Sequence, residues 1–446
     1  MIHEFSVQNF KSLENFKIEL NKFNLLVGRN ATGKTNVIEA FKLFKDISWM
    51  HDPFFNPFFK WGGYKNVVWR GKEELPIMFG YKAKVEDYNI SYNVHLTGYG
   101  GKFEILRKSM SISGVLDVIM EGNSLTIKHH PKFIEEVLDN VKEVLMSFGK
   151  KISKDLLLFQ EYEILEQKTL RDLSTFGWYV GYSGNFAIVT LHIPTKSGVP
   201  IIISPTVEKI RVRHEFDGFK EETHVEPIIT YVMPSTSKLI HPIIILRQLN
   251  FEEITTPQPV KREIMLAEDG SNLANVLHTI YTDRGKIPRR IERVLRLIFG
   301  DVNVRPKITE DGRVFIHVYE NSYSLHPKNV SDGFWKVLTI LTAIELNPVM
   351  ILIDELENSL HPEAIEYIVN ELKSSNSIVI ATTHSPAIVD IVVPEDLILL
   401  EKDRDGKTAR RRVKDASEVK KWLAEHGITL SEGWLYGEVF QSINYD

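Results

Sequence analysis

The chain has 446 residues, of which 43% are hydrophobic, 25% charged and 10% aromatic, a composition typical of globular proteins. Its formal charge is -5, so no overall basic excess indicates a nucleic-acid partner, although a local basic face stays open. The absence of cysteine excludes disulfides, thiol nucleophiles and iron–sulfur clusters. The first residues lack a leader pattern, and no apolar run reaches membrane-spanning length. We therefore expect a soluble, cytoplasmic protein with no membrane partner.

The first 50 residues predict two short strands, followed by a buried strand, a loop and a helix. The apolar run at 23–27 has the character of a buried strand. From Lys34 onward, Val37, Phe41 and Phe44 recur at helical spacing. The segment between the strand and the helix is therefore held at both ends by regular structure.

That segment has the pattern of a phosphate-binding loop. Its residues fit G-x-x-x-x-G-K-[ST] without a gap. In such a loop the backbone N–H groups surround the phosphates, the lysine reaches the β- and γ-phosphates, and the last hydroxyl binds Mg²⁺. The alternative is a chance match in a glycine turn, which the flanking strand and helix argue against. The predicted nucleotide-binding residues are Gly28, Arg29, Asn30, Ala31, Thr32, Gly33, Lys34, Thr35 and the next residue, Asn36, with Thr35 also a metal ligand.

Residues 51–264 differ in character from both ends of the chain. Residues 51–130 are rich in aromatic residues and glycine and contain alternating stretches, which predict strands. Residues 131–175 place apolar side chains at helical spacing and predict one or two amphipathic helices, and 176–246 return to short strands. We expect an inserted, mixed α+β lobe. Heptads are not sustained in it, so a long coiled coil is not expected.

From about residue 265, predicted helices and strands alternate. The helices cover 271–281 and 288–299 and begin again at Phe334 and Pro362, and the buried strands cover 349–353 and 377–382. Such alternation favours a largely parallel sheet. The predicted fold class is therefore α/β. We expect residues 1–50 and 265–446 to form one split domain around the inserted region 51–264.

Two acids follow the apolar strand at 349–353. Carboxylates at the end of a buried strand are costly unless a cation meets them. We expect Asp354 to hold Mg²⁺, directly or through water, and Glu355 to polarise the attacking water as general base. The alternative is a strand that simply runs out into solvent, which the phosphate-loop pattern elsewhere in the chain makes less attractive.

Two further sites are candidates because of where they lie relative to the phosphate loop and the two acids. Ser331 and Gly333 stand at the start of the predicted helix from Phe334, where a serine is usually an N-cap but can also bind a γ-phosphate. His384 follows the strand at 377–382, where it can donate to the γ-phosphate and hold the attacking water. Taken alone, such a histidine is more often structural. The other three elements favour function.

Together these elements resemble ABC-type P-loop ATPases of the structural-maintenance-of-chromosomes (SMC) and RecF-like branch, and more closely the prokaryotic AAA family ATPases with a split cassette. Similar segments are 7–13, 268–274, 399–406 and 433–438, and the resemblance covers roughly 1–50 and 265–440. Related overcoming-lysogenization-defect (OLD-like) proteins carry a Toprim nuclease domain. The 62 residues after His384 are too few for it, so we expect this domain to be absent.

The resemblance implies a role for each element. The loop would be Walker A, Asp354 the Walker B acid and Glu355 the catalytic carboxylate. Ser331 and Gly333 would form the signature, acting on ATP held by the other subunit of a head-to-tail homodimer. Asn358 and Ser359 would fall in the D-loop, and His384 would be the switch histidine. Departures are Ala31 for a frequent glycine, Asp332 for another, and Leu356 for a proline, and no Q-loop glutamine could be assigned.

We therefore predict a Mg²⁺-dependent ATPase, with ATP and Mg²⁺ as cofactors, that forms an ATP-sandwich homodimer coupled to DNA maintenance or phage defence. The alternative is an ATP-switched scaffold with little hydrolysis that presents a separately encoded effector protein, a nuclease or a toxin. Nuclease activity within the chain is disfavoured, since no acid cluster with clear metal spacing exists outside the predicted ATP site.

Two basic clusters leave double-stranded DNA open as a partner. Arg289, Arg293 and Arg296 fall on one face of the helix at 288–299, and the second cluster lies within 404–414. A solvated basic face is the commoner outcome, and no aromatic residues are interleaved as in single-strand platforms. Asp403 and Asp405 are spaced like a metal-binding pair, but Gly406 favours a plain hairpin turn there.

Overall fold

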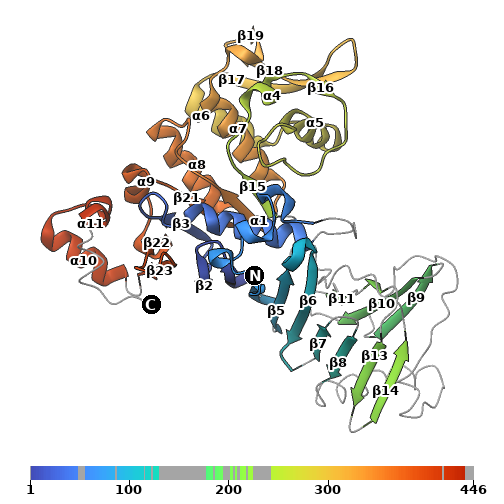
Figure 1. The fold of residues 1–446 in the computed structure, drawn as a ribbon. Helices are drawn as coiled ribbons and strands as arrows, with labels where there is room; N and C mark the ends of the chain where they lie inside the picture. Colours follow the sequence, from blue (N-terminus) through green and yellow to red (C-terminus); the bar gives the residue numbers. More distant parts are fainter. Residues whose placement is uncertain are drawn as a thin grey trace, which may run out of the picture. The chain divides into compact units, whose positions relative to one another are not determined.

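The computed structural model describes residues 2–48, 56–85, 88–114, 116–121, 124–129, 177–183, 186–193, 201–203, 206–207, 211–216, 219–224, 243–413 and 416–436 (Figure 1). The chain divides into two compact units, one of residues 1–19 and 40–240 and the other of residues 20–39 and 241–446. These boundaries differ from the domain boundaries proposed above, at 50/51 and 264/265, which stay a prediction. The helices predicted within 131–175 lie outside the described residues.

The unit of residues 20–39 and 241–446 is built on a parallel sheet. Among the described residues it has six strands, in the order β15 (Ile243–Leu246), β20 (Met350–Ile353), β21 (Ile378–Thr382), β3 (Phe23–Val27), β22 (Leu397–Lys402) and β23 (Thr408–Arg412). The first five run parallel, and β23 pairs with β22 as an antiparallel hairpin. β3, β20 and β21 are buried along their whole length, as expected for parallel strands covered on both faces. The predicted α/β class is confirmed.

Helices bury this sheet in one core. They include α5 (Leu273–Arg284), α6 (Arg289–Phe299), α7 (Asp332–Glu345), α8 (Pro362–Ser374) and α9 (Pro386–Ile391). Every residue of α7 from Phe334 to Ile344 is buried, because its sequence is apolar around nearly the whole circumference. α6, α7 and α8 lie side by side (Figure 1). The helices predicted near residues 271, 288, 334 and 362 are all present.

The remaining elements of this unit are smaller. A short antiparallel sheet contains β16 (Gln258–Pro259), β17 (Val302–Ile308), β18 (Arg313–Glu320) and β19 (Tyr323–Leu325), and the other helices are α4 (Phe251–Thr255), α10 (Ala416–His426) and α11 (Leu430–Tyr436). At the β22–β23 turn, the Asp403 carboxylate accepts the backbone N–H groups of Asp405 (2.9 Å) and Lys407 (2.8 Å). The predicted hairpin turn is confirmed.

The basic face of α6 is engaged within its own unit. Arg293 forms an ion pair with Glu371 of α8, and Arg296 donates to the side chain of Asn303 at 2.9 Å. Arg290 lies 3.2 Å from Glu371 and 3.6 Å from Glu345. Carboxylates thus neutralise part of this face, which weakens the case for nucleic-acid phosphates as its ligand.

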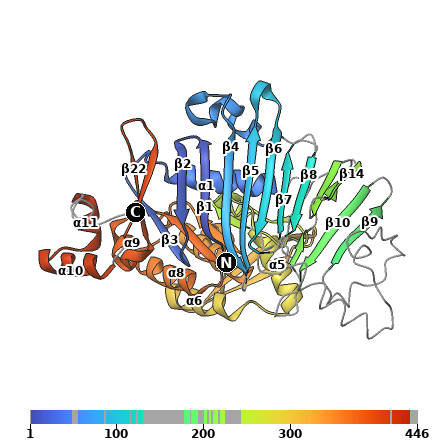
Figure 2. The ribbon, with the colours of Figure 1, turned by 90° about the horizontal axis from the view of Figure 1, so that it is seen from below.

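The unit of residues 1–19 and 40–240 is mostly antiparallel sheet. Its described strands follow the order β14 (Phe219–His224), β13 (Arg211–Phe216), β8 (Ser124–His129), β7 (Leu116–Glu121), β6 (Glu104–Ile112), β5 (Tyr88–Thr97), β4 (Ile77–Val85), β1 (Ile2–Phe10) and β2 (Leu13–Glu19). Figure 2 shows five of these strands side by side, in the spatial order β2, β1, β4, β5 and β6. A smaller sheet contains β9 (Gly177–Ser183), β10 (Phe186–Ile193), β11 (Ile201–Ile203) and β12 (Thr206–Val207). Strands predicted within 51–130 and 176–246 are therefore present.

An aromatic cluster joins β1 to the second part of α1 (Lys34–Ser48) in this unit. The ring of Phe5 stacks on Phe41 with centroids 3.9 Å apart, and Phe44 and Phe79 surround the pair. The boundary between the units therefore falls inside α1, after Glu39. No helix in the described part of the chain is long and apolar enough to cross a membrane.

Candidate nucleotide-binding site

The predicted site residues follow adjacent strands of the parallel sheet. β3 leads into the loop 28–33, β20 into Asp354 and Glu355, and β21 into Thr383 and His384. Because these strands are parallel neighbours, their carboxyl ends reach the same edge, where open α/β sheets bind ligands. β15 adds Arg247 and Gln248 at this edge, beside the strand that carries the two acids.

The loop after β3 surrounds the ammonium group of Lys34. Lys34 is 5% exposed, and its Nζ donates to the carbonyl oxygens of Gly28 (2.7 Å) and Arg29 (3.1 Å). Burial lowers the pKa of Lys34, and the negative charges of Asp354, Glu357 and Glu355 act against that shift. The loop therefore presents a cation close to three carboxylates, at the start of a helix whose N-terminus favours anions.

Two residues of the loop show why small side chains are needed there. A Cβ on Gly28 would lie 2.4 Å from the carbonyl oxygen of Leu400 in β22, so the loop packs directly on the neighbouring strand. Ala31 has φ of 64°, in the left-handed region that glycine adopts without strain. The alanine thus holds the conformation that the frequent glycine at this position provides.

Thr382 links the two acids after β20. Its hydroxyl donates to Oδ1 of Asp354 at 2.7 Å and accepts the backbone N–H of Glu355 at 2.8 Å. The other oxygen of Asp354, Oδ2, accepts Nε of Arg247 at 3.2 Å. Both oxygens of this carboxylate are therefore engaged by side chains from the strands on either side of β20.

Glu355 is held in an uncommon conformation. Its φ is 52°, which is rare for a residue with a long side chain. Its carbonyl oxygen accepts Nζ of Lys336 at 2.8 Å, and its carboxylate accepts the side-chain amide of Asn358. Left-handed conformations of this kind persist only where surrounding contacts enforce them, and they concentrate at functional sites.

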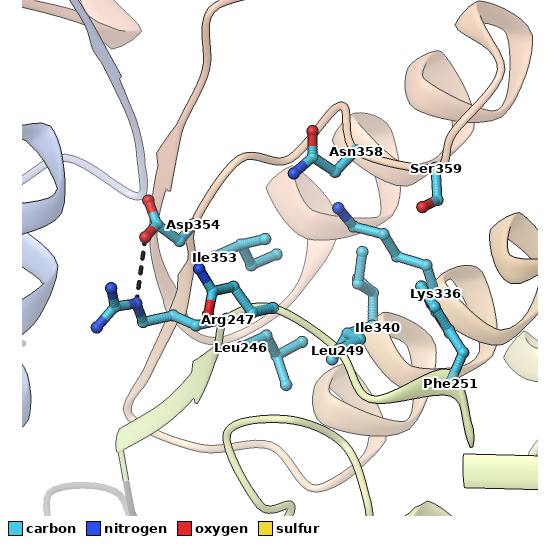
Figure 3. A pocket seen from close by; sticks show the side chains of 11 residues that line it. Leu246, Arg247, Leu249, Phe251, Lys336, Ile340, Ile353, Asp354, Asn358 and Ser359 are labelled. Atoms are coloured by element: carbon cyan, nitrogen blue, oxygen red, sulfur yellow. Dashed lines mark hydrogen bonds and ion pairs between the residues drawn. The ribbon is translucent and has the colours of Figure 1, made fainter. Parts of the chain in front are cut away.

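Lys336 is a buried lysine on α7 that the sequence did not single out. It is 5% exposed, and Figure 3 shows its side chain reaching from the helix toward the loop of Asn358 and Ser359. Burial lowers the pKa of Lys336 to about 8, and the nearby charges of Glu357, Glu355 and Asp354 act in the opposite direction. Its ammonium group therefore adds a second cation to this group of acids.

We expect Lys336→Met to change how stability depends on pH. Between about 8, the folded-state pKa, and the ordinary value of 10.5, the unfolded chain binds a proton that the folded chain does not. The wild-type free energy of unfolding therefore gains a contribution of about 3 kcal/mol as pH rises through this window. Below pH 8 the buried charge opposes folding fully, so the variant should be the more stable there by a similar amount.

Urea unfolding at pH 7 and pH 10 checks this, with the exposed Lys286→Met as control. The difference between Lys336→Met and wild type should shrink toward pH 10, whereas Lys286→Met should follow wild type. A Lys336→Met difference that does not change with pH would show that this lysine has an ordinary pKa.

Ser331 and Gly333 line a different pocket from Asp354. Ser331 is the N-cap of α7, where its hydroxyl accepts the backbone N–H of Phe334 at 3.3 Å. A Cβ on Gly333 would lie 2.5 Å from the carbonyl oxygen of Ser359, so the start of α7 packs directly on the loop after β20. Ser331 and Gly333 share their pocket with Ser359 and His361, and Ser359 also lines the pocket that contains Asp354.

His384 is exposed at the end of β21, and a neighbouring acid holds its backbone. Its N–H donates to Oε1 of Glu357 at 2.6 Å. The other oxygen of Glu357, Oε2, is buried without a hydrogen-bond partner in the described part of the chain. The loop after β20 is thus connected to the backbone of His384, the predicted switch histidine. The side chain of His384 is not used in this contact, and the residue is exposed.

Sequence reasoning missed several members of the site. Arg247 and Gln248 line the pocket with Asp354, and Gln248 has φ of 42°. Gln248 follows β15, the strand that pairs with β20. The signal was present, because Ile243–Leu246 is as apolar as 350–353, but this segment was assigned to the inserted region.

The donor set suits a small oxygen-binding cation. Among the described residues no group of three or more His, Asp or Glu side chains could enclose a metal ion. Asp354 and Gln248, which line one pocket, offer oxygen donors, and Thr35 stands in the first turn of α1 after the loop. Mg²⁺ is typically bound in this way, by one or two protein oxygens together with water and substrate phosphates.

These features are typical of a P-loop nucleotide-binding fold. They are a parallel α/β sheet, a loop bounded by glycines, a helix that follows it, and two acids after a nearby strand. Two family models match the chain. "AAA ATPase domain" covers residues 1–176, and "AAA domain, putative AbiEii toxin, Type IV TA system" covers residues 238–390. The first range contains the loop 28–35, and the second contains Ser331, Asp354, Glu355 and His384. Both models describe AAA-type domains, so two stretches of the chain are similar to AAA ATPases. No curated protein matches it.

Similar solved structures are SMC heads. An Smc head bound to the C-terminal winged-helix domain of ScpA has 11% identity and a TM-score of 0.47, covering 94% of this chain and 99% of that one. A head from Thermotoga maritima has 12% identity and a TM-score of 0.39, with coverage of 93% and 99%. A Pyrococcus furiosus head bound to the C-terminal domain of ScpA has 10% identity and a TM-score of 0.48, with coverage of 96% and 99%.

Proposed function

We propose that this chain binds ATP with Mg²⁺ and hydrolyses it. The observation that carries the proposal is the meeting of a phosphate loop, through Lys34, with the acids Asp354 and Glu355 at one edge of the parallel sheet. Lys34 and the backbone N–H groups of residues 28–36 bind the phosphates. Glu355 acts as general base on the attacking water, and His384 contacts the γ-phosphate.

Thr35 and Asp354 hold Mg²⁺ in this proposal, and Gln248 takes the place of the Q-loop glutamine. The metal supplies charge neutralisation between the β- and γ-phosphates when it is bound. The residues of the chain do the remaining work. Thr382 orients Asp354, and Lys336 and Asn358 fix the backbone and carboxylate of Glu355.

We further propose a head-to-tail homodimer that closes on two ATP molecules. Ser331 and Gly333 line a pocket other than the one with Asp354, which supports a signature that acts on the nucleotide of a second copy. The direct packing of Gly333 on Ser359 would let closure at the signature reach the loop that holds Glu355. Hydrolysis would then open the dimer.

The biological setting that we favour is defence with a partner protein. The description of one matched family names a toxin and a toxin–antitoxin system, and the ion pairs on α6 weaken the alternative of DNA maintenance.

The second candidate function is an ATP-switched scaffold with little hydrolysis that presents a separately encoded nuclease or toxin. The side-chain amide of Asn358 donates to the Glu355 carboxylate. It occupies an oxygen that would otherwise accept the proton of the attacking water, and this supports little hydrolysis.

The test is Mg²⁺-dependent ATP turnover at low salt, with and without duplex DNA, using Glu355→Gln as blank. We expect turnover above the blank that duplex DNA does not change. Strong stimulation by DNA would overturn the protein-partner setting. Nucleotide binding with turnover equal to the blank would overturn hydrolysis and leave the scaffold.

A further inference from the structure

Arg247 stands between two acids at the edge of the sheet. Its Nε lies 3.2 Å from Oδ2 of Asp354, and its Nη1 lies 3.5 Å from Oε1 of Glu39 on α1. The three side chains are 19%, 12% and 14% exposed. These are largely buried ion pairs, so the charges act on one another with little screening by solvent. Figure 3 shows the guanidinium turned toward Asp354.

The backbones on which this contact depends are fixed. The N–H of Arg247 donates to the carbonyl oxygen of Glu268 at 2.8 Å, and the N–H of Asp354 donates to that of Leu246 at 3.0 Å. Thr382 occupies Oδ1 of Asp354. A cation that approaches this carboxylate therefore meets one oxygen held by a hydroxyl and the other by a guanidinium.

Glu39 offers the guanidinium a second position. It lies four residues after Thr35 on α1, so both face the same side of the helix. The contact to Asp354 is the shorter of the two ion pairs, and the contact to Glu39 is already formed at longer range. The side chain can thus release Asp354 and still keep Glu39 as a counter-charge.

We propose that Arg247 is a positioning residue that sets the metal affinity of the site, by competing with the divalent cation for Asp354 and moving to Glu39 when the cation binds. The proposal rests on the proposed function, because it assumes a divalent metal at Asp354. A doubly charged ion near Oδ2 repels the guanidinium at close range, so binding the ion includes the cost of displacing the arginine. Removing the positive charge should therefore strengthen metal binding.

The experiment measures Mn²⁺ affinity by electron paramagnetic resonance on the full chain saturated with a non-hydrolysable ATP analogue. We expect Arg247→Gln to bind Mn²⁺ about tenfold more tightly than wild type. Arg247→Lys keeps the positive charge but not the two separate donors, so it should tighten Mn²⁺ binding less than Arg247→Gln does. Arg262→Gln, which removes an exposed arginine paired with Asp283, is the matched control and should not change the affinity.

A Glu39→Gln background separates competition from a folding defect. Glu39→Gln alone should weaken Mn²⁺ binding, because Arg247 then has Asp354 as its remaining acid in this pair of contacts. Adding Arg247→Gln to that background should tighten binding again, and thermal melting confirms that each variant is folded. Since Arg247→Gln is compared within each background, the cycle isolates its effect.

Unchanged or weaker Mn²⁺ binding in a folded Arg247→Gln variant, in both backgrounds, would overturn the proposal and show that the arginine only orients Asp354. This result differs from failure of the proposed function. In that case the wild-type chain itself would bind neither the ATP analogue nor Mn²⁺, and Lys34→Ala would change nothing.

Discussion

Replacing Glu355 with glutamine should leave ATP binding intact and lower turnover by about three orders of magnitude. A positioned general base contributes roughly 10² to 10⁴ in rate, and an amide of the same shape cannot accept the proton of the attacking water. In the proposed site the phosphates contact loop 28–35 and not Glu355, so the dissociation constant for ATP should stay within about threefold. Steady-state phosphate release and equilibrium nucleotide binding measure the two quantities.

The same variant tests the proposed dimer. If hydrolysis opens an ATP-closed homodimer, Glu355→Gln should accumulate as a dimer with ATP and Mg²⁺, which light scattering after size exclusion detects. Glu366→Gln, an exposed acid on α8, is the matched control and should turn over ATP as wild type does. Turnover near the wild-type rate in Glu355→Gln would remove Glu355 from the role of base, and a monomeric variant with ATP bound would count against the dimer.

The elements that sequence predicted well are those with local signals. The strand 23–27 is followed directly by its loop and a helix. The apolar run and the glycine spacing therefore predict all three elements from a stretch of about 20 residues. The strand 350–353 is equally plain, since parallel strands buried on both faces have uninterrupted apolar sequences. Adjacency of the two acids to that strand then predicted their place at the sheet edge.

Contacts between residues far apart in the sequence could not be predicted from local sequence patterns. Arg247 meets Asp354 across 107 residues, and nothing near Arg247 in sequence marks its partner. Lys336 sits in an otherwise apolar helix, where the sequence alone does not show that its ammonium reaches a carbonyl on the loop after β20. Likewise, β1 and β2 precede the phosphate loop in sequence but hydrogen bond with β4 or with each other. Strand pairing of that kind depends on the whole sheet.

Lys34→Ala should abolish nucleotide binding while leaving the fold intact. Lys34 is the cation of the loop, so its loss should weaken ATP binding by at least about 100-fold through the missing charge-assisted bonds to the phosphates. Burial already lowers the pKa of Lys34, which means that the folded chain bears a cost for holding this charge. Removing it offsets the lost bonds to the carbonyls of Gly28 and Arg29, and the melting temperature should change by only a few degrees.

Equilibrium binding of a fluorescent ATP analogue, followed beside thermal melting, checks both parts of this prediction. Lys286→Ala, on the exposed turn after α5, should bind as wild type does. The comparison with Glu355→Gln separates the two steps of the proposed cycle, since one variant should lose binding and the other turnover. If Lys34→Ala bound ATP normally, the phosphates would have to lie away from loop 28–35, and the contacts of Lys34 with its own loop would then be purely structural.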